Sequence, residues 1–137
     1  MKFITITLLF FSTLVCAESE NFTEFFVGDY LLLGKGVDTD ETYSGKTVIY
    51  TEQGHLKLKR MIGGDSITGD IAFEPALGGE AEVLRIRFQD GGKKYEQTCL
   101  WQTDLNNYPR ISCYLYRPGV YTDKPGMEVM FHDRAAE

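Results

Sequence analysis

The sequence has few of the residues that usually carry catalysis or bind metals. Its 137 residues include only two histidines, His55 and His132, which lie far apart, and three cysteines. No group of histidines and cysteines has the spacing of a zinc site. The nucleophile motif Gly-x-Ser-x-Gly is absent, because the segment from Gly64 to Gly69 has the wrong spacing for it. We therefore predict that the chain is not an enzyme and needs no metal or cofactor.

Two other segments match ligand-binding motifs only in part. The acidic run at residues 38–41, DTDE, lacks the glycine and the distal glutamate of an EF-hand loop, and we interpret it as a solvated loop. The run at residues 34–36, GKG, is not followed by the helix that a phosphate-binding loop requires. Neither segment predicts a binding site.

Long helical patterns are absent beyond the N-terminal region, which argues against parallel β-α-β units. From residue 28 onward, apolar and polar residues alternate with a period of two, which is typical of half-buried β-strands. Short turns that contain glycine join most of the segments, while Pro75–Gly79 and Arg117–Met127 are expected to be loops. The expected strands cover Gly28–Lys35, Thr42–Thr51, His55–Ile62, Ile67–Phe73, Leu84–Phe88, the two arms of the segment Tyr95–Arg117, and a last strand that begins with Val129 and Phe131.

This pattern predicts an all-β domain of about eight strands, covering residues 18–137. A flat sheet of that size would expose one face and two edges, whereas an antiparallel barrel removes the edges and buries one face of every strand. A two-sheet sandwich is the alternative, and the run of tight sequential turns favours an up-and-down barrel. Residues 18–27, ESENFTEFFV, have the pattern of a short helix whose phenylalanines could plug one end of the barrel.

The segment Tyr95–Arg117 is predicted to form a hairpin that turns at Asn106 and is closed by a disulfide. Cys99 lies seven residues before Asn106 and Cys113 seven residues after it, so the two cysteines face each other in an antiparallel pair. Their Cα atoms would lie roughly 4.5 Å apart, within reach of a disulfide. Two buried free thiols are the alternative, and the symmetric register together with the expected export favours the disulfide.

Residues 1–17, MKFITITLLFFSTLVCA, have the pattern of a secretory signal peptide. Lys2 begins it, an almost wholly apolar run follows, and Val15-Cys16-Ala17 provides small residues for cleavage. The run is too short for a membrane-spanning helix, which needs about 20 residues, so we expect no stable membrane insertion. Lipidation at Cys16 is the alternative, but the residues before it fit that signal poorly. We expect cleavage after Ala17 and a secreted or periplasmic protein.

The chain is acidic, with a formal net charge of −6, and loss of the one positive charge at Lys2 with the leader would make it −7. An acidic chain argues against nucleic acid and anionic membranes as partners and suits a cationic partner. Solubility alone is the commoner reason for such a charge.

Two short segments at the ends of the expected barrel resemble lipocalins and related small barrels. Residues 28–30, GDY, begin the first strand and are similar to the Gly-x-Trp start of that group, with Tyr30 in place of Trp. Residues 132–134, HDR, end the last strand and are placed like the arginine that packs across that Trp. The chain is short for a lipocalin and has no room for the C-terminal helix, so the resemblance is to the wider lipocalin-like and avidin-like barrels. It implies that Tyr30 and Arg134 pack at one barrel end and that the barrel mouth holds a cavity for a small ligand.

Two arginines interrupt the apolar faces of their strands. Arg60 lies on the apolar face of the third strand, and Arg117 lies on the cysteine face of the hairpin together with Tyr95. An arginine inside a small barrel needs a carboxylate, a carbonyl or a ligand anion as its partner. Arg60, Arg117 and Tyr95 are therefore candidate ligand-binding residues. The alternatives are arginines that reach solvent or pair internally, and a tyrosine that is an ordinary residue of a half-buried sheet.

These features favour a secreted or periplasmic, non-enzymatic protein that binds a small, partly apolar ligand in a barrel cavity. The alternative is a protein-binding module, such as an inhibitor of a cationic hydrolase of the lysozyme type. The acidic charge, the hairpin and the loop Arg117–Met127 would suit that role. A hollow barrel lined by Arg60 or tyrosines would support the first hypothesis, and a filled one would weaken it.

If residues 1–17 are a signal peptide, the protein isolated from its native source begins at Glu18. N-terminal sequencing of that protein checks the expectation. A native chain that begins at Met1 would contradict the export argument and remove one support for the disulfide.

Overall fold

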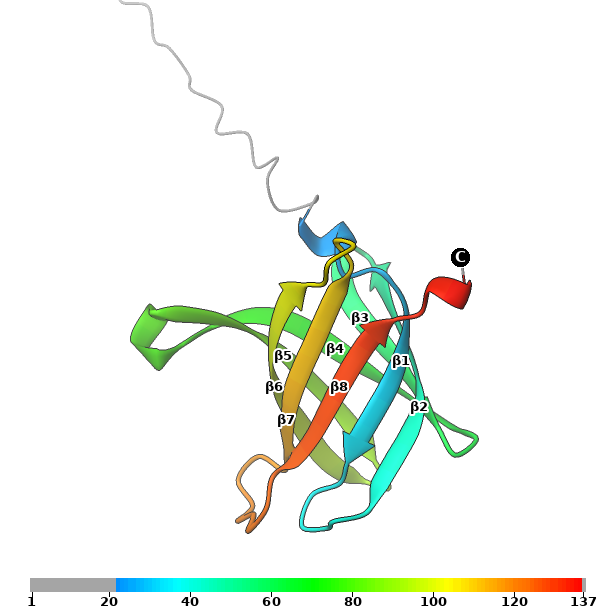
Figure 1. Ribbon diagram of the computed structural model, residues 1–137. Coiled ribbons are helices and arrows are strands. Elements are labelled where there is room, and N and C mark those ends of the chain that lie inside the picture. Colours follow the sequence, from blue (N-terminus) through cyan, green and yellow to red (C-terminus); the bar gives the residue numbers. More distant parts are fainter. Residues whose placement is uncertain (1–21, 137) are drawn as a thin grey trace, which may run out of the picture.

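The computed structural model describes residues 22–136, so the expected signal peptide, residues 1–17, lies outside the described residues. Eight strands follow one another along the chain (Figure 1). None of the helices within residues 22–136 is long and apolar enough to cross a membrane. The elements are β1 (Gly28–Lys35), β2 (Thr42–Glu52), β3 (His55–Ile62), β4 (Asp65–Ala76), the 3-10 helix η1 (Leu77–Gly79), β5 (Ala81–Asp90), β6 (Lys93–Thr103), β7 (Pro109–Tyr116), β8 (Gly126–His132) and the 3-10 helix η2 (Arg134–Ala136).

Each strand pairs antiparallel with the next one, and β8 pairs with β1 to close the barrel. This order confirms the predicted up-and-down barrel and excludes the two-sheet sandwich. Leu32, Ile49 and Leu58 point inward and are almost fully buried, while their neighbours in sequence are more exposed. The period of two in the sequence therefore separates the inside of the barrel from its outside.

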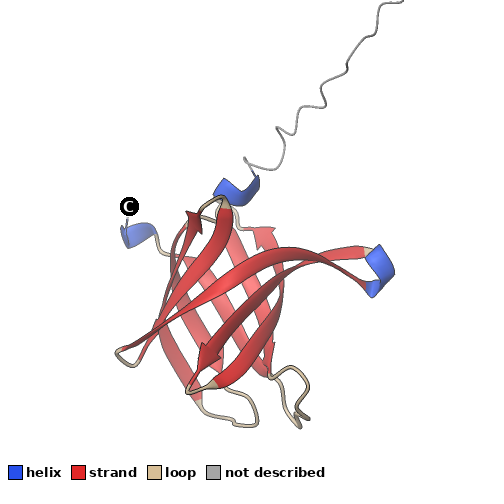
Figure 2. Ribbon diagram, turned by 180° about the vertical axis from the view of Figure 1, so that it is seen from behind, coloured by secondary structure: helices blue, strands red, loops and turns tan. Residues whose placement is uncertain are grey.

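The β4–β5 hairpin is longer than the sequence indicated. Pro75–Gly79 was expected to be a loop, but β4 continues to Ala76, and Pro75 pairs with Glu82. The ladder between β3 and β4 ends at Asp70, so the far part of β4 has only β5 as its partner. A proline fits there because its missing N–H falls on a free edge. The hairpin therefore projects beyond the barrel wall, as Figure 2 shows.

Strand β8 also begins earlier than expected, at Gly126 rather than Val129. A Cβ atom on Gly126 would lie 2.8 Å from the backbone oxygen of Lys35, so only glycine lets this end of β8 come so close to β1. The Pro-Gly pairs before it had indicated a loop through Met127. The earlier start adds Glu128 to the inward face of the strand, which places a carboxylate inside the barrel.

The hairpin of β6 and β7 has the predicted register. Cys99 faces Cys113 with a Cα–Cα distance of 4.0 Å, and the two residues form a disulfide. Trp101 faces Ile111 in the same register. The predicted disulfide is thus confirmed, and it joins two neighbouring strands of the wall.

Aromatic side chains close one end of the barrel. Residues 22–24 form a short helical turn at the end where the β6–β7 turn lies (Figure 1). Phe26, which is 1% exposed, has its ring centroid 5.6 Å from that of Trp101 and 5.5 Å from that of Phe73. The Tyr30 hydroxyl donates a hydrogen bond of 2.7 Å to the carbonyl oxygen of Phe26. The chain entering β1 is thereby fixed across this end.

Removing the disulfide with the pair Cys99→Ala and Cys113→Ala should lower the free energy of unfolding by about 3 kcal/mol, because the bridge restricts the unfolded chain across a loop of roughly 15 residues. Urea titration followed by Trp101 fluorescence measures the loss. Wild-type protein unfolded under reducing conditions is the control and should lose a similar amount. Equal stability of oxidised and reduced protein would contradict the expectation.

Candidate functional site

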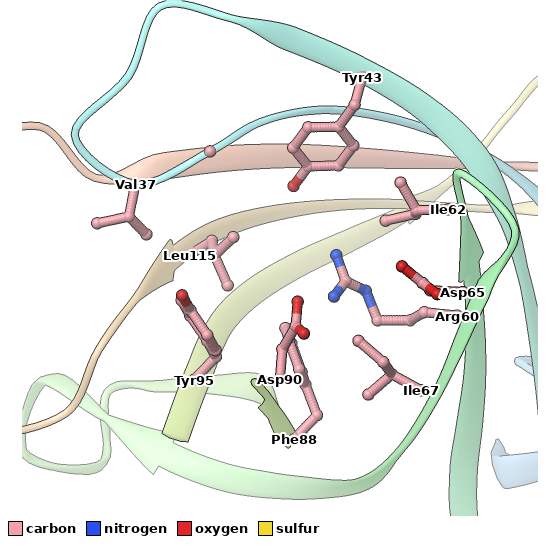
Figure 3. A pocket seen from close by; sticks show the side chains of 11 residues that line it. Val37, Tyr43, Arg60, Ile62, Asp65, Ile67, Phe88, Asp90, Tyr95 and Leu115 are labelled. Carbon is pink, nitrogen blue, oxygen red and sulfur yellow. The ribbon is translucent and has the colours of Figure 1, made fainter. Parts of the chain in front are cut away.

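A cavity of about 320 Å³ lies at the barrel end opposite the aromatic cluster (Figure 3). The β1–β2 loop, the β3–β4 turn and the β5–β6 turn form its rim, and inward side chains of the strands form its walls. It is lined by Gly36, Val37, Tyr43, Arg60, Ile62, Asp65, Ile67, Phe88, Asp90, Tyr95 and Leu115. The mouth of the barrel is therefore hollow, and its lining is a mixture of aliphatic, aromatic and charged groups.

Arg60 points into the barrel, as the alternation in β3 predicts, and is only 5% exposed. Its Nη2 donates to the Oε1 atom of Glu128, which is fully buried. The guanidinium carbon lies 4.2 Å from the centroid of the Phe88 ring, in a cation–π contact. Arg60 therefore pairs internally, which is one of the alternatives that the sequence left open. Glu128 balances its charge without a ligand.

The Glu128 carboxylate accepts two further hydrogen bonds. The Tyr43 hydroxyl donates to its Oε1 atom, and the Gln97 side-chain amide donates to its Oε2 atom. A buried carboxylate needs such donors, because transfer of an unpaired charge from water into the interior is costly. We call Tyr43, Arg60, Gln97 and Glu128 the polar cluster.

A glycine makes room for the tyrosine of the polar cluster. Gly34 on β1 pairs with Tyr43 on one side and with Glu128 on the other. A Cβ atom on Gly34 would lie 2.5 Å from the Tyr43 ring. The ring thus lies across the backbone of β1, where only glycine permits it, and its hydroxyl reaches the carboxylate.

The Tyr43 hydroxyl remains protonated over the physiological range. Burial raises its pKa well above the ordinary value, and the nearby negative charge of Glu128 raises the pKa further. The hydroxyl is therefore a constant hydrogen-bond donor to the carboxylate.

Three buried side chains each have a polar atom without a hydrogen-bond partner among residues 22–136. These atoms are the Thr47 hydroxyl oxygen, the Arg60 Nε and the Gln97 Oε1, and all three are buried. Most buried polar groups in proteins have a partner, so such atoms need an explanation. Arg60 also lines the cavity, but its Nε is buried beneath the cavity wall.

Of the other candidate binding residues, Tyr95 lines the cavity and Arg117 does not. The Tyr95 ring stacks on Phe88 with a centroid distance of 5.5 Å and an interplanar angle of 15°. Arg117 follows β7, is half-buried, and its Nε has no hydrogen-bond partner in the described part of the chain. The structure therefore brings Arg60 and Tyr95 together at the mouth and leaves Arg117 outside the lining.

The two residues assigned to barrel-end packing lie at the closed end, and each has its own partners there. Tyr30 is fully buried, and its ring meets that of His132 edge-on, with centroids 5.4 Å apart. Arg134 lies instead over the ring of Tyr108, at 5.1 Å, and pairs with Asp104. His132 therefore lies against the ring of Tyr30.

Sequence reasoning missed five polar residues of the site: Tyr43, Gln97, Glu128, Asp65 and Asp90. The alternation of β2, with Tyr43 two residues before an inward glycine, was a usable signal for the first. Asp65 and Asp90 stood at predicted turns, where an acidic residue is ordinary. Glu128 fell between the expected loop, which ended at Met127, and the expected last strand, which began with Val129.

The sequence matches no model of a known protein family, and a search of curated proteins finds no relative. Within the described residues, no three histidine, cysteine, aspartate or glutamate side chains are placed to hold a metal ion. The choice of function therefore depends on the geometry and charge of the cavity.

Replacing Arg60 with methionine should lower the free energy of unfolding by about 3–5 kcal/mol, because the change leaves the Glu128 carboxylate buried without its counter-charge. The double variant Arg60→Met/Glu128→Gln should recover most of the loss, since it removes both charges. Chemical denaturation of the ligand-free proteins measures these differences.

Lys59→Met is the matched control, because Lys59 is the exposed neighbour of Arg60 on β3, and its effect should stay within about 0.5 kcal/mol. A small loss for Arg60→Met alone would show that the pair with Glu128 contributes little to stability.

Proposed function

We propose that this is an exported, non-enzymatic binding protein that takes a small, partly apolar ligand into the barrel mouth. The observation that carries the proposal is the hollow mouth itself. Ile62, Ile67, Phe88 and Leu115 contribute apolar walls, and a few polar groups stand among them. Ligand sites have this character, and a volume of about 320 Å³ is at the lower end of their usual range of roughly 300–1,000 Å³. A ligand of about the size of a single-ring compound fits this space.

The polar cluster supports a binding role more than a catalytic one. Its carboxylate is fully engaged by three donors, and its tyrosine keeps its proton. Neither group is arranged to exchange a proton with a substrate, which a general acid or base must do. The cluster instead forms a fixed polar floor beneath the cavity.

A protein partner is the second candidate, and one observation favours it. The outer face of β1, β7 and β8, continued onto β6, carries a group of exposed apolar side chains where a barrel wall is usually polar. They are Leu31, Leu33, Leu100, Tyr114, Met127 and Phe131.

The electrostatic support for a cationic hydrolase as that partner is weaker. Asp38 accepts hydrogen bonds from the backbone of Asp123 and Lys124, and Asp40 pairs with Lys35 and Lys124. Much of the acidic loop is therefore engaged within the chain.

Native mass spectrometry of the protein purified from its own host tests the proposal. We expect a bound species of small mass that is lost on denaturation. The variant Ile67→Trp should lose it, because the indole fills the cavity. Thr68→Trp should keep it, because Thr68 is the exposed neighbour of Ile67. Retention of a protein partner in place of a small mass would favour the second candidate. A small mass that Ile67→Trp also retains would place the ligand elsewhere.

A further inference from the structure

We infer that the ligand of the barrel mouth carries a protonated amine on an apolar body. This inference rests on the proposed function and specifies the chemical class of the ligand. It follows from the charged side chains of the cavity that form no ion pair with another of the described residues.

The cation in the wall does not call for an anionic ligand. The Arg60 guanidinium is paired with Glu128, and Phe88 lies beneath it. A ligand carboxylate or phosphate placed against Arg60 would therefore meet the negative charge of Glu128 as well. The ligand anion and the Glu128 carboxylate would be two like charges in a site of low dielectric, where they repel each other strongly. The pair as a whole is neutral toward the cavity.

Two carboxylates at the rim are not compensated. Asp65 begins β4 and Asp90 ends β5, so two different turns bring them to the same cavity (Figure 3). Neither one forms an ion pair with another side chain among residues 22–136, although Lys93 stands opposite Asp90 in the β5–β6 register. The uncompensated charge of the cavity is therefore negative and lies at its entrance.

The walls suit the rest of such a molecule. The rings of Tyr43 and Tyr95 line the cavity, and aromatic rings attract organic cations through their π faces. The ammonium group then lies at the rim, and the apolar body lies against the walls of the cavity.

Three probes that share a 4-hydroxyphenyl ring separate the charge from the shape. They are tyramine, which is a cation, tyrosol, which is neutral, and 3-(4-hydroxyphenyl)propionate, which is an anion. Isothermal titration calorimetry at low salt should show tyramine binding about tenfold more tightly than tyrosol, and the anion most weakly. Added salt should weaken the binding of tyramine and leave that of tyrosol unchanged.

The double variant Asp65→Asn/Asp90→Asn should reduce the affinity for tyramine to that for tyrosol. Both positions are exposed, so we expect its melting temperature to stay close to that of the wild type. Glu82→Gln is the control, because it removes one negative charge from an exposed position outside the cavity lining, and it should leave all three affinities unchanged.

Equal binding of tyramine and tyrosol, tighter binding of the anion, or an unchanged affinity of the double variant for tyramine would overturn the amine assignment. In each of these cases, loss of probe binding in Ile67→Trp would still support a ligand cavity. If none of the probes binds the wild type, the amine assignment also fails. The native mass measurement then decides separately whether the mouth holds a ligand.

Discussion

The interior of the barrel depends on one buried carboxylate. Glu128 on β8 accepts hydrogen bonds from Tyr43 on β2, Arg60 on β3 and Gln97 on β6, so a single side chain links strands from around the wall. A buried charge with fewer partners would destabilise the fold, whereas one with a guanidinium and two neutral donors is tolerated. The formation of this cluster therefore requires the closure of β8 onto β1, because the carboxylate reaches its donors only in the closed barrel.

The polar cluster also divides the barrel into two unlike parts. Toward the N-terminal turn, Phe26, Tyr30 and Trp101 fill the space and make an ordinary apolar core. Toward the other end, the side chains leave a cavity. Apolar residues of similar volume in place of a buried ion pair are often equally stabilising, so stability alone does not explain the cluster. The cluster is explained if it serves as a polar floor. Such a floor keeps the apolar core from extending into the mouth, which accounts for the filled end and for the hollow one.

The fold was predictable from the sequence because its signals are local. The alternation of apolar residues and the glycine turns indicate the strands, and the symmetric spacing of Cys99 and Cys113 about Asn106 indicates the register of β6 with β7. The same alternation turned Arg60 inward. Its partner was not predictable, since Glu128 lies 68 residues away and the two approach each other only through closure of the barrel. A local pattern does not contain that information.

Strand β8 shows how the register of the last strand is decided. Hydrophobicity alone would turn Val129 and Phe131 inward, yet Phe131 is 40% exposed and Glu128 is buried. A slip of one residue would exchange the two faces. It would bring Phe131 inside, but it would expose Met130 and leave Arg60 without a counter-charge. An unpaired buried guanidinium costs about 3–5 kcal/mol, and this cost opposes the slip although the slip would also bury Met127 and Val129. The polar cluster therefore favours the observed register of β8, and the apolar residues on the outer wall are a consequence of that register.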